Sequence, residues 1–212
     1  MESLSRSSVI DLLSQLHDIP MSRETALIGR LQHFQRLKFP AGINVGSGKK
    51  AAYDAPAIVK LVVAFELMQF GLLPERAAKV VSFRAGQWLS HIAAKAGVSI
   101  LAVEESWEDD EFLLFDPIGL YSLSDPHDDG SAVLYTSVGL SRHQIASGLD
   151  GSDSEMRDNL HGLHRRFAAL NITSLLLRTA RYLEEQNWAT ETDFADALIK
   201  WGQDNEWSAD DD

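Results

Sequence analysis

Prolines and glycines divide the first half of this 212-residue chain into short segments. Pro20 and Pro40 lie at either end of one segment, and Gly71 and Pro74 separate two others. Proline breaks or opens a helix because its ring blocks the preceding turn, and glycine favours the left-handed conformation that follows a helix. These breaks predict four helices, at residues 8–16, 22–38, 54–70 and 74–97, with Ser22 and Asp54 as the N-caps of the second and third.

The second of these helices has two chemically different faces. Leu27, Leu31 and Phe34 recur at spacings of four and three, which is the spacing of one buried helix face. Cationic and amide residues lie off that face, namely Arg23, Arg30, Gln32 and Arg36. We therefore expect one side of this helix to pack and the other to meet solvent.

Residues 41–50 (AGINVGSGKK) contain three glycines and end in two lysines. Closely spaced glycines favour a turn, because glycine adopts a positive φ without steric cost. The segment predicts a flexible hairpin that carries Lys49 and Lys50 at its end.

The sequence changes character after Gly97. Short runs rich in β-branched and aromatic residues alternate with Asp, Pro and Gly clusters, which predicts strands at 98–103, 111–115 and 132–138 in a small antiparallel sheet. Helical spacing returns from Ser152 and continues through Leu170 to Leu177, and a last helix follows a capping-box pattern at Thr190 and Asp193. The apolar stripe in the first of these helices either forms a seam between subunits or packs on the chain's own sheet; its members are Leu160, Leu163, Phe167 and Leu170.

Composition restricts the class of protein. The chain has no Cys, which excludes thiolate metal ligands, disulfides and a cysteine nucleophile and fits a reducing compartment. No apolar run approaches the roughly 20 residues that a membrane-spanning helix needs, and the N-terminal residues lack a secretory apolar core. We expect a cytoplasmic protein with no membrane partner.

The net charge of −12 conceals a difference between the two halves. Residues 1–100 contain 12 Lys and Arg against 7 Asp and Glu, a net charge of +5, whereas residues 101–212 have a net charge of −17. Attraction to phosphate depends on the local field rather than on the total charge. The asymmetry indicates a basic interaction module joined to an acidic half, although an acidic surface also serves solubility alone.

Three stretches of the first half resemble a known family. They are residues 33–39 (HFQRLKF), 53–61 (YDAPAIVKL) and 67–77 (LMQFGLLPERA). In their order and spacing they are similar to the second helix, the wing exit with the third helix, and the turn into the fourth helix of the MerR-type winged helix-turn-helix. The MerR pattern usually has an arginine, an aromatic residue and a glycine where this chain has Gln32, His33 and Lys38.

The resemblance implies binding of double-stranded DNA by a homodimer. The 22–38 helix would lie in the major groove, where arginines and amides reach base edges and phosphates, and the glycine-rich hairpin would act as the wing on the DNA backbone. Tyr53 would hydrogen-bond a phosphate. The expected DNA-binding residues are Arg23, Arg30, Gln32, His33, Arg36, Lys49, Lys50 and Tyr53.

Signals for other chemistry are weaker. His161 and His164 lie three residues apart, but no cysteine or acidic pattern completes a metal site, and the acidic stretches at 104–111 and 125–129 lack the ligand spacing of a calcium loop. No Gly-x-Ser-x-Gly motif or phosphate-binding loop is present. We therefore expect no enzyme activity, no cofactor and no metal site.

Taken together, the sequence predicts an α+β protein with two domains. Residues 1–96 are expected to form the winged helix-turn-helix, and residues 97–212 an acidic domain of a small antiparallel sheet with flanking helices, which serves dimerisation or binds a protein partner or small-molecule effector. The predicted function is a sequence-specific DNA-binding transcription regulator that acts as a homodimer. The alternative is a protein-interaction adaptor whose winged helix no longer binds DNA and whose acidic half docks a basic partner, because the charge asymmetry fits both.

Overall fold

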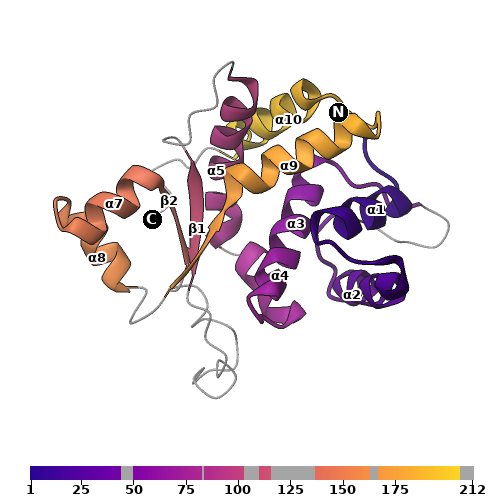
Figure 1. The fold of residues 1–212 in the computed structure, drawn as a ribbon, viewed down its shortest axis with the longest axis horizontal. Coiled ribbons are helices and arrows are strands. Elements are labelled where there is room, and N and C mark those ends of the chain that lie inside the picture. The colour runs from indigo at the N-terminus through magenta and orange to yellow at the C-terminus, as the bar shows by residue number, and fades with distance from the viewer. Residues whose placement is uncertain (44–49, 83, 103–109, 116–136, 163–166, 206–212) are drawn as a thin grey trace.

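A computed structural model describes residues 1–43, 50–82, 84–102, 110–115, 137–162 and 167–205 of the protein. Figure 1 shows a mostly helical α+β fold in which helices flank one small antiparallel sheet. The elements are, in chain order, α1 (Arg6–Leu16), the 3-10 turn η1 (Met21–Arg23), α2 (Glu24–Arg36), α3 (Ala55–Gln69), α4 (Pro74–Ser82), α5 (Arg84–Leu101), β1 (Glu111–Phe115), β2 (Ser137–Ser141), α7 (Arg142–Asp150), α8 (Ser154–Gly162), β3 (Ala168–Asn171), α9 (Ile172–Glu185) and α10 (Glu191–Gln203).

The central strand of the sheet is β1, which pairs antiparallel with β2 on one side and with β3 on the other. Successive side chains of a strand point to opposite faces. Leu113 and Phe115 therefore join the main core, while Leu114 joins a second, small cluster with Leu140. In Figure 1, α5 and α9 lie on one side of the sheet, and α7 and α8 lie on the other.

One hydrophobic cluster joins both ends of the chain. It includes Leu4 and Phe34 near the N-terminus and Leu176, Phe194 and Leu198 from α9 and α10, all of them buried. Helices α9 and α10 pack on α5, and both also contact α3. The domain boundary expected at residue 96 therefore falls inside α5, beside a core to which both ranges contribute.

Glycines bring α5 and α10 into close contact. A Cβ on Gly97 would lie 2.8 Å from the carbonyl oxygen of Ala195, and a Cβ on Gly202 would meet the Cβ of Ala94. Gly97 was expected to end a helix before a strand at 98–103. That expectation is wrong for residues 98–101, because α5 continues to Leu101 and Gly97 serves the approach of α10.

Polar side chains hold β1 to the helices around it. The Lys95 ammonium of α5 lies 2.9 Å from the buried Glu111 carboxylate, and the Glu111 backbone N–H donates to the Thr173 hydroxyl of α9 at 3.0 Å. The Asn171 amide donates to Asp110 at 2.8 Å, and its oxygen accepts the Ser174 backbone N–H as the N-cap of α9. A buried carboxylate needs such partners, because burial without them is costly.

Several expected features are confirmed. The strand at 111–115 is β1, and Asp54 caps α3 by accepting the Ala57 backbone N–H at 3.0 Å. Gly71 follows α3 with a φ of 89°, the left-handed conformation that glycine favours. Thr190 and Asp193 form the expected capping box of α10.

The single helix expected from Ser152 to Leu177 is wrong, although its last part, from Ile172 to Leu177, is helical in α9. Helix α8 ends at Gly162, and Leu170 lies in β3, where it pairs with Leu113 of β1. The unpaired N–H and C=O groups along the edge of β1 need partners, and satisfying them outweighs the local helical spacing. The apolar stripe, for which a seam between subunits and packing on the chain's own sheet were both left open, is therefore not one helix face.

Helix α7 was not expected. Its signal is the pair Ser141 and Gln144, which form a capping box in which each side chain bonds the backbone N–H of the other residue.

Within the described residues, no helix combines the length and the apolar character needed to cross a bilayer.

The close contact at Gly97 gives a testable prediction. Gly97→Ala should lower the free energy of unfolding by about 1–3 kcal/mol, because the added methyl group overpacks the α5–α10 contact. Urea denaturation followed by circular dichroism measures the change. Gly29→Ala is the matched control, because a Cβ on Gly29 of α2 meets no atom within 4 Å. That variant should gain about 0.5–1 kcal/mol from the better helix former. An unchanged urea midpoint for Gly97→Ala would show that the α5–α10 contact can accommodate the added methyl group without loss of stability.

Candidate nucleic-acid interface

Helix α2 packs by one face and exposes the other. Leu27, Leu31 and Phe34 are fully buried, and the Phe34 ring lies 5.5 Å from the Phe65 ring of α3. Figure 1 shows α2 at the periphery of the molecule, beside α1 and α4. The expected division of this helix into a packed side and a solvent side is confirmed.

The start of α2 differs from the expectation. The chain enters α2 through η1, so that Ser22 lies inside this turn and Arg23 is the N-cap, with no side-chain hydrogen bond to the helix. Ser22 is therefore not the N-cap. The connection between α1 and α2 covers residues 17–23, which is longer than the three- or four-residue turn of a simple helix-turn-helix.

The exposed face of α2 is basic and narrow. Arg30, Gln32 and Arg36 are exposed, and so is Arg23 directly before the helix. Small side chains lie between them on the exposed surface, namely Thr25, Ala26 and Gly29. A groove of nucleic acid can approach such a surface closely while the long side chains reach past the helix on both sides.

His33 has a partner on another helix. Its Nε2 lies 2.7 Å from Oε1 of Glu75 in the first turn of α4, and both side chains are partly exposed. A hydrogen bond from the backbone N–H of Glu75 lowers the pKa of the Glu75 carboxyl, and the hydrogen bond and charge of His33 lower it further. His33 is thus positioned by Glu75, a residue that the sequence did not single out, because 42 residues separate the two.

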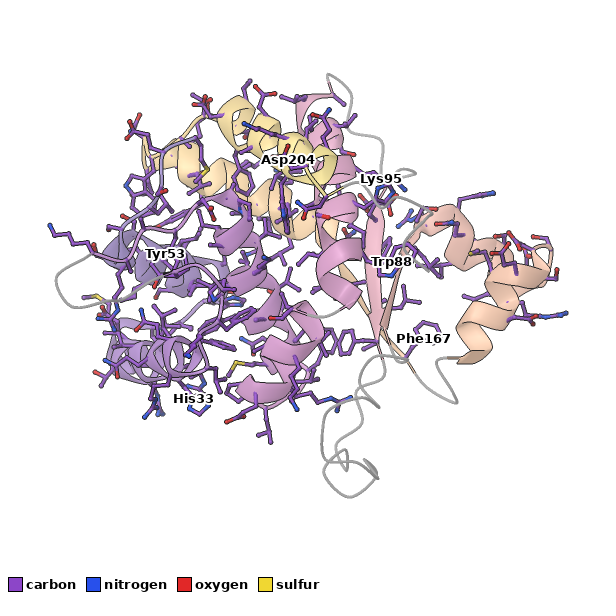
Figure 2. The ribbon with its side chains drawn as sticks, turned by 180° about the vertical axis from the view of Figure 1, so that it is seen from behind. His33, Tyr53, Trp88, Lys95, Phe167 and Asp204 are labelled. Carbon is purple, nitrogen blue, oxygen red and sulfur yellow. The ribbon has the colours of Figure 1, made fainter. Side chains whose placement is uncertain are left out.

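Tyr53 does not lie where a phosphate contact requires it. Its side chain is 1% exposed, and its hydroxyl accepts a hydrogen bond from the Gln35 amide at 3.0 Å. Its backbone forms an antiparallel bridge with Leu4. The phosphate role expected for Tyr53 is corrected to a core role, in which it joins α2 to the segment before α3; Figure 2 shows Tyr53 among the N-terminal helices and His33 at their edge.

The expected wing lies mostly outside the described residues. Lys49 belongs to residues 44–49, for which no structure is described, and Lys50 is exposed. After that gap, Tyr53 forms the isolated antiparallel bridge with Leu4 that is described above. His164, the second member of the weak histidine pair, also lies outside the described ranges, within which no group of His, Asp and Glu could hold a metal ion.

A polar groove of about 540 Å³ forms a second candidate site between α1 and α9. Asp11 and Asp18 line it together with Tyr182 and the amide of Gln15. Burial raises the pKa of the Tyr182 hydroxyl, and the negative charges of Asp11 and Glu185 raise it further. The sequence did not indicate this groove, since its two walls come from opposite ends of the chain.

Comparisons with family models, with curated proteins and with solved structures gave no match in any of the three.

The buried position of Tyr53 gives a second prediction. Tyr53→Phe should lower the free energy of unfolding by about 1 kcal/mol, because it removes the hydrogen bond from Gln35, and should leave affinity for duplex DNA unchanged. Thermal unfolding and fluorescence anisotropy with a labelled duplex measure the two quantities. A variant that keeps its stability but binds duplex DNA more weakly would restore Tyr53 to the set of contact residues.

Proposed function

We propose that the protein is a sequence-specific, double-stranded DNA-binding regulator that inserts the exposed face of α2 into the major groove. The observation that carries the proposal is the joint exposure of Arg30, Gln32 and Arg36 on a helix whose other side is fixed in the core. Arginine forms bidentate hydrogen bonds with guanine and glutamine with adenine, and both also bind phosphates.

The backbone after α2 supports the resemblance to the MerR type. Lys38 has a φ of 58°, the left-handed conformation that favours glycine. This is the position at which the MerR pattern usually has a glycine. A chain that turns here in the same way can bring the following segment back beside α2, as a winged helix requires.

Charge supports the same orientation on DNA. Residues 1–100 have a net charge of +5 and residues 101–212 a net charge of −17. Phosphates attract the first range and repel the second, so the α2 side meets the duplex first.

A homodimer is part of the proposal. One helix of 13 residues reads a single half-site. Two copies related by a two-fold axis would read a roughly palindromic site with half-sites about one helical turn apart, which raises specificity.

The test is duplex-DNA binding by selection from genomic fragments at two salt concentrations. Arg30→Glu with Arg36→Glu should weaken binding on the order of 100-fold and flatten the salt dependence, because two contacts are replaced by repulsion. The control is Arg157→Glu with Lys200→Glu, which makes the same change in net charge at exposed positions of α8 and α10 and should bind as the wild type does. No enrichment of any motif by folded wild-type protein would contradict the proposal.

The groove between α1 and α9 favours a second candidate function, an adaptor that docks a basic partner, although through carboxylates of the first half rather than through the acidic half. Asp11 and Asp18 offer carboxylates to lysine or arginine side chains, and Tyr182 adds an aromatic wall. In this function, α2 has no nucleic-acid partner and the groove carries the binding.

Variants of the groove test the adaptor function. If the adaptor function holds, Asp11→Asn with Asp18→Asn should weaken binding of an arginine-rich peptide at least tenfold, since two charge-assisted contacts are lost. Asp196→Asn on α10 with Asp204→Asn directly after it is the control of equal charge change. Isothermal titration calorimetry measures both. Equal peptide affinity in the wild type and the groove variant would exclude the groove as the docking site.

A further inference from the structure

A carboxylate lies against the middle of the basic row on α2. Arg30, His33 and Arg36 follow one another at spacings of three, so they are neighbours on the helix surface. Glu75 bonds the central member, His33, at 2.7 Å. An acid at this place needs an explanation, because it repels the phosphates that the two arginines attract.

The bond uses one ring nitrogen of His33 and leaves the other. The ion pair and the hydrogen bond both join Nε2 to Glu75, and within the described part of the chain Nδ1 makes no hydrogen bond. In the neutral ring, the Nε2–H donates to the carboxylate and Nδ1 can only accept, so it offers nothing to a phosphate oxygen. In the imidazolium, both nitrogens donate, and Nδ1–H can bind a phosphate while Nε2–H stays with Glu75.

We propose that Glu75 is a positioning residue of the α2 surface, which holds His33 by Nε2 so that its imidazolium donates from Nδ1 to a DNA phosphate between Arg30 and Arg36. This inference rests on the proposed DNA binding, and it makes that binding depend on protonation of His33. Binding of DNA takes up a proton from solvent at each His33 whose ring is neutral in the free protein, because only the charged ring makes the contact. Affinity for DNA therefore falls as the pH rises, because the neutral ring cannot donate from Nδ1 to a phosphate.

Other charges around α2 act on this contact. Helix α2 packs against α4, α1 and η1. The charged and titratable groups on these elements and at the end of α1 are Glu24, Arg30 and Arg36 on α2, Glu75, Arg76 and Lys79 on α4, Arg6, Asp11 and His17 on or next to α1, and Arg23 on η1. Lys79 lies one turn after Glu75 on α4 and is exposed, so it moderates the repulsion between Glu75 and phosphates.

The experiment measures the salt dependence of affinity at about pH 6 and about pH 8, using a mixed-sequence duplex of about 30 base pairs, which is long enough for two half-sites. A phosphate contact does not depend on base sequence, so an unselected duplex reports it. For the wild type, the slope of log affinity against log salt should be steeper at the lower pH by about 0.9 for each protomer in contact, and affinity should be about tenfold higher.

Two variants separate the proposed role from simpler ones. His33→Gln should show the same slope at both pH values. Glu75→Gln should lose most of the pH dependence, because the ring is no longer held with Nδ1 toward the phosphate. If Glu75 only repelled phosphate, Glu75→Gln would bind more tightly by the same factor at both pH values. If Glu75 only joined α4 to α2, Glu75→Gln would bind more weakly by the same factor at both.

Control variants test whether the pH dependence is specific to His33 and Glu75, and unfolding measurements test whether each variant is folded. His91→Gln and Glu184→Gln change exposed residues of α5 and α9 and should keep the pH dependence of the wild type. Thermal unfolding of each variant confirms that it is folded at both pH values. Wild-type binding with one slope at both pH values, or a pH dependence retained in His33→Gln or Glu75→Gln, would overturn this inference and leave the proposed function standing. No binding at either pH would overturn both.

Discussion

The enclosure of α3 is the constraint on which the rest of the structure depends. Ten of its fifteen residues are buried, and they lie on every side of the helix rather than on one stripe. A helix of this kind cannot remain at a surface, because each large apolar side chain gains about 1.5–3 kcal/mol from burial. Helices α1, α4, α9 and α10 all contact it. The end of the chain is therefore needed to complete the core of its beginning, and the surface of α2 rests on a core that both halves of the sequence build.

Local signals in the sequence identified elements whose ends are fixed by their own residues. The start of α3 follows from Asp54, and the start of α10 follows from Thr190 and Asp193, because a capping side chain bonds the backbone only three residues away. The strand β1 was also predicted, since it is a short run of large apolar residues. The resulting α+β class with a small antiparallel sheet agrees with the structure.

Elements fixed by distant residues could not be predicted in the same way. Gly97 looks like a helix stop, yet its role comes from α10, which follows almost a hundred residues later. Residues 168–171 continue a helical spacing, yet they pair with β1. In both cases tertiary contacts decide between two local structures that have similar intrinsic free energies.

The same distinction applies to the candidate interface. The exposure of Arg30, Gln32 and Arg36 follows from the spacing of the apolar residues within one helix, so it could be predicted. The burial of Tyr53 and the bond between His33 and Glu75 depend on how separate segments meet, so they could not. An aromatic residue with a hydroxyl fits a phosphate contact and a core hydrogen bond equally well until its surroundings are known.

The two clusters on either side of β1 divide the protein into regions of unequal resistance to local unfolding. The second cluster contains two buried side chains, Leu114 and Leu140, with Phe112, Ile145 and Met156 packed on them. Detaching α7 and α8 exposes far less apolar surface than opening the main core, so this helix pair opens at lower free energy and exchanges its amide hydrogens sooner. Because alternate residues of β1 belong to the two clusters, this strand is the element that both regions share.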